Sequence, residues 1–232
     1  MHEQHITPPR AILFDLDGTL DDRSRSVARY AEQFHRAFAD RMAPIGVADL
    51  VSLIQAADGD GYRQRDAVSE DLRRLLPWRA TPDRQQLVDH WYTWFPVSAA
   101  PRAGLVDVLQ ALRARGIALG VVTNGGVRLQ QTKIDSLGVR DYLSTIVISE
   151  TVQVTKPDPA IFAHALAELG CFPADAWFVG DHPLNDVLGA NAAGLRGVWL
   201  PALHPWPAEH PQPAWRIASL VEILALVESR VS

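Results

Sequence analysis

Residues 11–20 constrain the fold more than any other part of this 232-residue chain. The stretch begins with four apolar residues, 11–14, which is typical of a strand buried in a parallel sheet. Asp15, Asp17 and Gly18 follow directly. Because desolvating an unpaired charge is costly, we expect both carboxylates to lie at the C-terminal end of that strand. Ligands bind at this edge of open α/β sheets, so the stretch predicts a sheet and a site together.

Two carboxylates at the end of one strand also predict a cation. Residues two apart in an extended chain point the same way, so Asp15 and Asp17 can face one site. Two acids at one point repel each other unless a cation or a shared proton lies between them. A hard divalent cation with oxygen ligands, Mg²⁺ first among them, meets this requirement. Gly18 allows the chain to turn sharply out of the strand.

The composition is that of a globular protein, with 47% hydrophobic and 21% charged residues. A net charge of −5 gives no reason to expect nucleic acid or an anionic membrane as a partner, and no apolar run reaches the length of a membrane span. The single cysteine, Cys171, argues against a disulfide framework. The first ten residues lack the apolar segment of a signal peptide. Together these features favour a cytoplasmic protein.

Residues 22–97 show helical periodicity and no convincing strand. Prolines and glycines divide the region into four predicted helices. The first starts from a cap at Asp22 or Ser24 and runs to Phe38, and the others cover about residues 47–57, 62–76 and 82–95. We therefore predict a small helical domain, inserted after the first strand.

From about residue 98 the pattern changes to alternating strands and helices. The alternation predicts a doubly wound, Rossmann-like parallel sheet, an α/β fold formed by residues 1–21 and 98–232. The predicted strands are residues 11–14, 117–122, 145–148, 176–179 and 197–200. Predicted helices near the end of the chain cover residues 184–193 and 219–228.

Polar side chains follow several of these strands. Thr123 and Asn124 stand before a helix, where a hydroxyl and free backbone N–H groups can hold a phosphate. Lys156 adds a positive charge, and Asp181 with Asp186 adds a second acidic cluster. Each residue alone has an ordinary explanation, as a helix cap, a surface lysine or a turn acid. Their order is informative, because all such turns open on the same edge of a parallel sheet.

This order resembles the four motifs of the haloacid dehalogenase superfamily, in its phosphatase form, over about residues 12–200. The helical insertion resembles the C1 cap of that superfamily. The matching residues are Asp15-Leu16-Asp17-Gly18-Thr19 for motif I, Val121-Val122-Thr123 for motif II, Lys156 for motif III, and Gly180-Asp181 with Asp186 for motif IV. More narrowly, residues 123–125, 130–134, 156–162 and 189–195 resemble the branch of pyrimidine nucleotidases and N-acylneuraminate phosphatases. His182 departs from that branch, and either a turn role or a site role is open for it.

The resemblance implies a Mg²⁺-dependent phosphate monoester hydrolase that acts on a small metabolite such as a nucleotide or a sugar phosphate. Asp15 is implied to be the nucleophile that forms an aspartyl-phosphate, and Asp17 to be the general acid and then the general base. The implied metal ligands are Asp15, the backbone carbonyl of Asp17 and Asp181, with Asp186 nearby.

The remaining implied residues bind the phosphate or the leaving group. Thr123, the Asn124 amide and Lys156 are implied to neutralise the phosphoryl group. Arg63 and Arg65, in the loop of residues 58–65, are candidates for substrate specificity, and a solvated helix start is the alternative.

Three other functions are considered on the same fold. A haloacid dehalogenase would lack Asp17, because its ester intermediate needs no acid for the leaving group. A phosphomutase would keep Asp17 and stays open. A non-enzymatic binding module would be expected to lose a motif residue, and none is lost here. A monomer and a homodimer are both compatible with the sequence.

Overall fold

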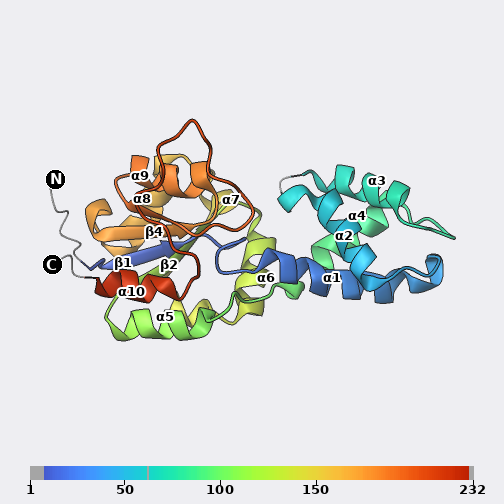
Figure 1. Ribbon diagram of the computed structural model, residues 1–232, viewed down its shortest axis with the longest axis horizontal. Helices are drawn as coiled ribbons and strands as arrows, with labels where there is room; N and C mark the ends of the chain where they lie inside the picture. Colours follow the sequence, from blue (N-terminus) through green and yellow to red (C-terminus); the bar gives the residue numbers. More distant parts are fainter. Residues whose placement is uncertain (1–7, 62, 230–232) are drawn as a thin grey trace. The chain divides into compact units, whose positions relative to one another are not determined.

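The computed structural model describes residues 8–61 and 63–229 (Figure 1). It divides into two compact units. The helical unit is Asp22–Ala100, and the core unit consists of the residues before and after it. In the described residues, no helix is long and apolar enough to cross a membrane.

The core unit contains a parallel sheet of five strands among the described residues, in the order β3-β2-β1-β4-β5. The strands are β1 (Ala11–Phe14), β2 (Ala118–Thr123), β3 (Thr145–Ile148), β4 (Ala176–Gly180) and β5 (Arg196–Trp199). The last residue of β1, Phe14, pairs with Val121 on one side and with Val179 on the other. Because these three strands end together, the loops that follow them lie at one edge. The predicted α/β fold with a parallel sheet is confirmed.

Helices cover both faces of this sheet (Figure 1). On one side lie α5 and α10, and on the other lie α8 and α9. Apolar residues of α8 pack with residues of β2 and β4 in one buried cluster. The helices of this unit are α5 (Leu105–Ala114), α6 (Val127–Leu137), α7 (Ser149–Val152), α8 (Pro159–Leu169), α9 (Gly189–Ala192) and α10 (Glu222–Glu228).

One predicted helix of the core unit begins differently from the expectation. Residues 184–193 were expected to form a single α-helix, but a π-helical segment, Pro183–Leu188, precedes α9. The Nδ1 atom of His182 accepts hydrogen bonds from the N–H groups of Leu184 and Asn185, at 3.2 and 3.1 Å. His182 therefore caps this segment, and the wider turn carries Asp186 into the interior. Single π-helical turns are common at functional sites.

The helical unit consists of four α-helices and short 3₁₀ turns in its described residues. The α-helices are α1 (Arg23–Phe38), α2 (Val47–Asp58), α3 (Arg65–Leu75) and α4 (Arg84–Trp94). Asp22 caps α1, as expected, because its carboxylate accepts from the Arg25 N–H group at 3.1 Å. The third helix was expected to begin near Tyr62, which lies outside the described residues.

The ends of the helical unit are held to each other. The Asp22 N–H group donates to the Ala100 carbonyl at 2.8 Å, and the Ala100 N–H group donates to Ser26 Oγ, also at 2.8 Å. Residues 98–100 therefore belong with the helices, slightly beyond the boundary at residue 97 that the sequence suggested.

Aromatic side chains form the core of the helical unit, around the fully buried Tyr30. The ring of Tyr30 lies 4.8 Å from that of Trp91 and 5.7 Å from that of Phe95, both with edge-to-face geometry. Its hydroxyl hydrogen-bonds to Nδ1 of His90 at 3.0 Å. Burial lowers the pKa of His90 to about 4, because the charged ring loses solvation among these side chains.

This burial predicts an acid-sensitive helical unit. The folded-state pKa of His90 lies below the unfolded value, so between about pH 6.5 and 4 the unfolded chain binds a proton that the folded chain does not. Stability is therefore lost as the pH falls through this range. Between pH 7 and 5, we expect His90 to lower the free energy of unfolding by at most about 2 kcal/mol.

Urea unfolding of the His90→Gln variant at both pH values tests this expectation. The difference in stability between wild type and variant should shift toward the variant at pH 5. His164→Gln, at an exposed position on α8, is the matched control and should show no such shift. A constant difference for His90→Gln would contradict the assignment.

Candidate active site

A buried charged cluster lies at the C-terminal edge of the sheet. Asp15 follows β1, Asp181 follows β4, Asp186 lies on the π-helical segment, and Lys156 precedes α8. All four side chains are buried. Burying ionisable groups is tolerated only where they pair with one another or with a ligand, so the cluster is a candidate functional site.

Lys156 is the cation of this cluster. Its Nζ atom lies 2.6 Å from Oδ1 of Asp15 and 2.7 Å from Oδ1 of Asp186. The Asp15 N–H group donates to the Val179 carbonyl at 2.9 Å, so the nucleophile candidate continues the hydrogen bonding of the sheet. Burial lowers the pKa of Lys156, but Asp15 and Asp186 together raise it above its usual range. Lys156 is therefore a permanent positive charge, not the surface lysine that its sequence context alone suggests.

One lysine does not balance three carboxylates. Asp15, Asp181 and Asp186 each offer an oxygen, and these oxygens lie within 4.8 Å of one another. Burial raises the pKa of Asp15 to about 7, although Lys156 opposes the rise. Burial, reinforced by Asp15 and Asp186, raises the pKa of Asp181 to about 8. Without a further cation, the cluster thus retains protons that isolated carboxylic acids would have lost at neutral pH.

The donor set fits a hard divalent cation such as Mg²⁺, which prefers carboxylate oxygens. Gly18, with a positive φ of 78°, allows the chain after β1 to lie close to the Asp181 carboxylate. A Cβ at this position would lie 2.5 Å from Oδ2 of Asp181. Asp15 and Asp181 follow adjacent strands, and their carboxylate oxygens lie close enough to bind one ion. Asp186 offers a third oxygen but is also held by Lys156.

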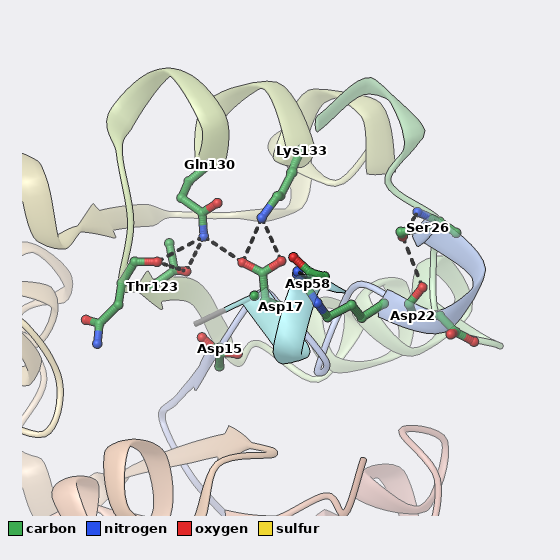
Figure 2. Close-up of polar contacts among 12 residues, drawn as sticks. Asp15, Asp17, Asp22, Ser26, Asp58, Thr123, Gln130 and Lys133 are labelled. Carbon is green, nitrogen blue, oxygen red and sulfur yellow. Dashed lines mark hydrogen bonds and ion pairs between the residues drawn. The ribbon is translucent and has the colours of Figure 1, made fainter. Parts of the chain in front are cut away.

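The carboxylate of Asp17 points away from this cluster, toward α6 (Figure 2). Lys133 Nζ lies 2.6 Å from Oδ1 and 2.8 Å from Oδ2 of Asp17. Gln130 Nε2 donates to Oδ2 at 2.9 Å. The sequence analysis assigned no role to Lys133 or Gln130. The sequence feature that could have pointed to them is their spacing, since two polar residues lie one turn apart on the inner face of a helix. Both are buried in the structure.

The loop after β2 is tied to the segment before α8. The Asn124 side chain donates to the Lys156 carbonyl at 3.0 Å and accepts from the Lys156 N–H group at 2.8 Å. Thr123 is buried at the end of β2, and its Oγ1 atom accepts from Gln130 Nε2 at 2.6 Å. The structure thus brings the predicted phosphate-binding residues Thr123, Asn124 and Lys156 to one edge of the sheet.

Some backbone N–H groups of this loop are already used within the protein. The Gly125 N–H group donates to Ser149 Oγ at 3.0 Å, and the Val127 N–H group donates to Glu150 Oε2 at 2.6 Å. Free backbone N–H groups were expected in this turn, and those of Gly125 and Val127 instead donate to side chains of the short helix α7.

Arg63 and Arg65 are held by carboxylates of their own helical unit. Arg65 Nη1 lies 2.6 Å from Asp58 Oδ1, and its guanidinium lies over the Trp91 ring at 4.6 Å. Arg63 Nη1 lies 2.7 Å from Asp71 Oδ2. The exposed fraction of the side chain is 38% for Arg63 and 14% for Arg65, so Arg63 is the more accessible of the two.

The chain resembles known proteins in sequence. The sequence model of the haloacid dehalogenase-like hydrolase family matches residues 9–194. The chain therefore belongs to this family of hydrolases, and the predicted membership is confirmed.

Two curated relatives show which hydrolases this chain resembles in sequence. The pyrimidine 5′-nucleotidase YjjG of Escherichia coli is 39% identical over 128 residues, which cover 55% of this chain and 56% of the relative. The chain thus matches only about half the length of that protein. The glyceraldehyde 3-phosphate phosphatase of Methanopyrus kandleri is 30% identical over 201 residues, covering 80% of this chain and 81% of the relative.

Solved structures share the fold over nearly the whole chain. The HAD-hydrolase YfnB of Bacillus subtilis has a TM-score of 0.75 at 22% identity, covering 96% of this chain and 100% of its own. The L-2-haloacid dehalogenase of Xanthobacter autotrophicus has a TM-score of 0.71 at 18% identity, covering 95% and 99%. The fold alone therefore does not separate phosphatases from dehalogenases.

The carboxylate cluster predicts that Mg²⁺ stabilises the folded protein. At a concentration about ten times the Kd, binding adds about 1.4 kcal/mol, which corresponds to a rise of a few degrees in Tm. Asp181→Asn should remove most of this rise, because it replaces a charged ligand with a neutral one. Asp107→Asn, at an exposed position on α5, is the matched control and should keep it. An equal rise in both variants, measured by calorimetry, would place the ion elsewhere.

Proposed function

We propose that this protein hydrolyses phosphate monoesters of small metabolites through a phosphorylated Asp15, with Mg²⁺ as cofactor. The observation that carries the proposal is the pair of aspartates after β1, in two different environments. Asp15 is buried against Lys156, as a nucleophile next to the transferring phosphoryl group needs. The Asp17 carboxylate is held by α6 and its side chain is 29% exposed, so it is accessible enough to exchange a proton.

In the first step, a carboxylate oxygen of Asp15 attacks phosphorus, and the bond from phosphorus to the leaving oxygen breaks. Asp17 gives its proton to that oxygen, so the alcohol leaves neutral. In the second step, water attacks phosphorus and gives a proton to Asp17, and the bond from phosphorus to Asp15 breaks. Inorganic phosphate leaves, and both aspartates return to their starting states.

Other residues of the site bind the phosphoryl group. Lys156 neutralises charge on its oxygens, and the Thr123 hydroxyl and the Asn124 amide donate to them. Asp15, Asp181 and the backbone carbonyl of Asp17 hold Mg²⁺ in this proposal. When bound, the ion supplies positive charge that complements the phosphoryl group.

The relatives support the class of substrate more than its identity. One is named for a pyrimidine 5′-nucleotide and the other for glyceraldehyde 3-phosphate, so a small phosphate monoester is what the names share. Arg63 and Arg65 are our candidates for reading the leaving group, with Arg63 the more accessible. The proposal also includes a cytoplasmic location and no nucleic acid or membrane partner.

Asp17 also favours this function over dehalogenation on the same fold. In a dehalogenase, the carboxylate attacks carbon and displaces a halide as the ester forms; a halide needs no proton, so an acid at this position would have no task. Two side chains of α6 hold Asp17 here, which favours a reaction that uses it. A phosphomutase would transfer the phosphoryl group to a second substrate hydroxyl instead of water.

The direct test is release of inorganic phosphate from 4-nitrophenyl phosphate and from a panel of phosphorylated metabolites. We expect activity near neutral pH that EDTA abolishes and Mg²⁺ restores, and no activity in Asp15→Asn. Release that depends on an added acceptor alcohol would indicate a phosphomutase. Full activity after rigorous chelation would contradict the metal assignment.

The double role of Asp17 gives a sharper prediction. Nitrophenolate leaves well without a proton, so Asp17→Asn should still phosphorylate Asp15 with the aryl substrate. Attack by water needs the base, and loss of general base help typically costs about 10²- to 10⁴-fold. The variant should therefore release up to one nitrophenolate per site in a burst, followed by slow turnover.

The phosphorylated variant should be recoverable after acid quench and visible by mass spectrometry. Asp15→Asn should show neither burst nor adduct. Wild-type steady turnover in Asp17→Asn, with no adduct, would rule out the double role.

A further inference from the structure

Helix α6 carries two buried polar residues one turn apart, Gln130 and Lys133, which are 2% and 6% exposed. Burying a lysine costs several kcal/mol unless a partner satisfies its charge, and the same helix carries an exposed cation, Arg128, where no such cost arises. Lys133 therefore needs a partner for its charge in the interior, which a surface lysine does not need.

Asp17 is such a partner (Figure 2). Lys133 Nζ contacts both carboxylate oxygens of Asp17, at 2.6 and 2.8 Å. Gln130 donates to one of the same oxygens at 2.9 Å. A carboxylate held at both oxygens cannot rotate freely about its last bond, although the Asp17 side chain itself is 29% exposed. The two residues of α6 thus fix the direction in which Asp17 presents its oxygens.

The same contacts join Asp17 to the phosphate-binding loop. Gln130 Nε2 also donates to Thr123 Oγ1 at 2.6 Å and approaches the Asn124 carbonyl at 3.3 Å. Asp17 and Thr123 therefore both accept hydrogen bonds from the side-chain amide of Gln130. A change in the position of Asp17 or Thr123 would alter the hydrogen bond to the other, because Nε2 of Gln130 carries only two hydrogens.

We propose that Lys133 is a positioning residue that aims the Asp17 carboxylate at the oxygen entering or leaving the phosphoryl group. The inference rests on the proposed phosphatase function and extends it to a residue outside the four motifs. Proton transfer requires close alignment of donor and acceptor, and a misplacement of about 1 Å costs on the order of 10²-fold. Lys133 provides that alignment from a rigid helix.

A leaving group that needs no proton separates this role from a structural one. In the step up to leaving-group departure, which kcat/KM reports, 4-nitrophenyl phosphate depends little on Asp17, whereas benzyl phosphate leaves an alkoxide and depends on it strongly. We expect Lys133→Met to lower kcat/KM at least about tenfold for benzyl phosphate and less than about threefold for 4-nitrophenyl phosphate. Arg128→Met, the matched control on the same helix, should change neither.

Two further readouts complete the test. In Lys133→Met, water attack should slow with both substrates, so phosphorylated enzyme should accumulate on 4-nitrophenyl phosphate and be trapped by acid quench. Adding Lys133→Met to Asp17→Asn should cost nothing more with benzyl phosphate, since a positioning residue has no effect without the group that it positions. If Lys133→Met does not fold by circular dichroism, Lys133→Gln keeps a polar end and is measured in its place.

Equal losses on both substrates, or additive losses in the double variant, would overturn the inference. So would an unchanged kcat/KM for benzyl phosphate. Failure of the proposed function looks different, because wild-type protein would then release no phosphate from either substrate.

Discussion

The ion pairs of Lys156 with Asp15 and Asp186 are the interaction on which the rest of the site depends. They join the end of β1 and the π-helical segment Pro183–Leu188 to the segment before α8, so three separate stretches of chain meet at one nitrogen atom. A buried charge network of this kind is costly unless every member is satisfied. Here one lysine lies near three acids, and burial together with the neighbouring carboxylates raises the pKa of Asp15 and of Asp181. In the proposed function, a bound divalent cation would balance the remaining negative charge and take part in the chemistry.

Around this cluster, candidate site residues are held by neighbours from other parts of the chain. Asn124 holds the backbone of Lys156 through two hydrogen bonds, and Lys133 holds the carboxylate of Asp17. Asp15 and Asp17 are two residues apart in sequence, yet Asp15 is buried among acids and a lysine, while the carboxylate of Asp17 is held by Gln130 and Lys133 of α6. These different surroundings suit the two tasks that we propose for them, nucleophile for Asp15 and proton carrier for Asp17.

Much of the fold was predictable because its signals are local. Apolar runs ended by polar residues located every strand of the described residues within one residue at each end, and Asp22 was a recognisable helix cap. The gathering of Asp15, Lys156 and Asp181 followed from the rule that parallel strands open on one edge. The contacts of Lys133 were not predictable, since its partner lies 116 residues away in sequence. Nor was the π-helical segment, which depends on the cap from His182 and on the inward position of Asp186.

The central claim is that the acidic cluster after β1 and β4 is a divalent cation site. Crystals soaked with Mn²⁺, a close substitute for Mg²⁺, test it directly by anomalous diffraction. The account predicts one strong anomalous peak at roughly 2 Å from a carboxylate oxygen of Asp15 and from one of Asp181. The peak should disappear in Asp181→Asn crystals grown and soaked in the same way. Ordered crystals with Mn²⁺ bound only at other positions, or with no peak between these two aspartates, would contradict it.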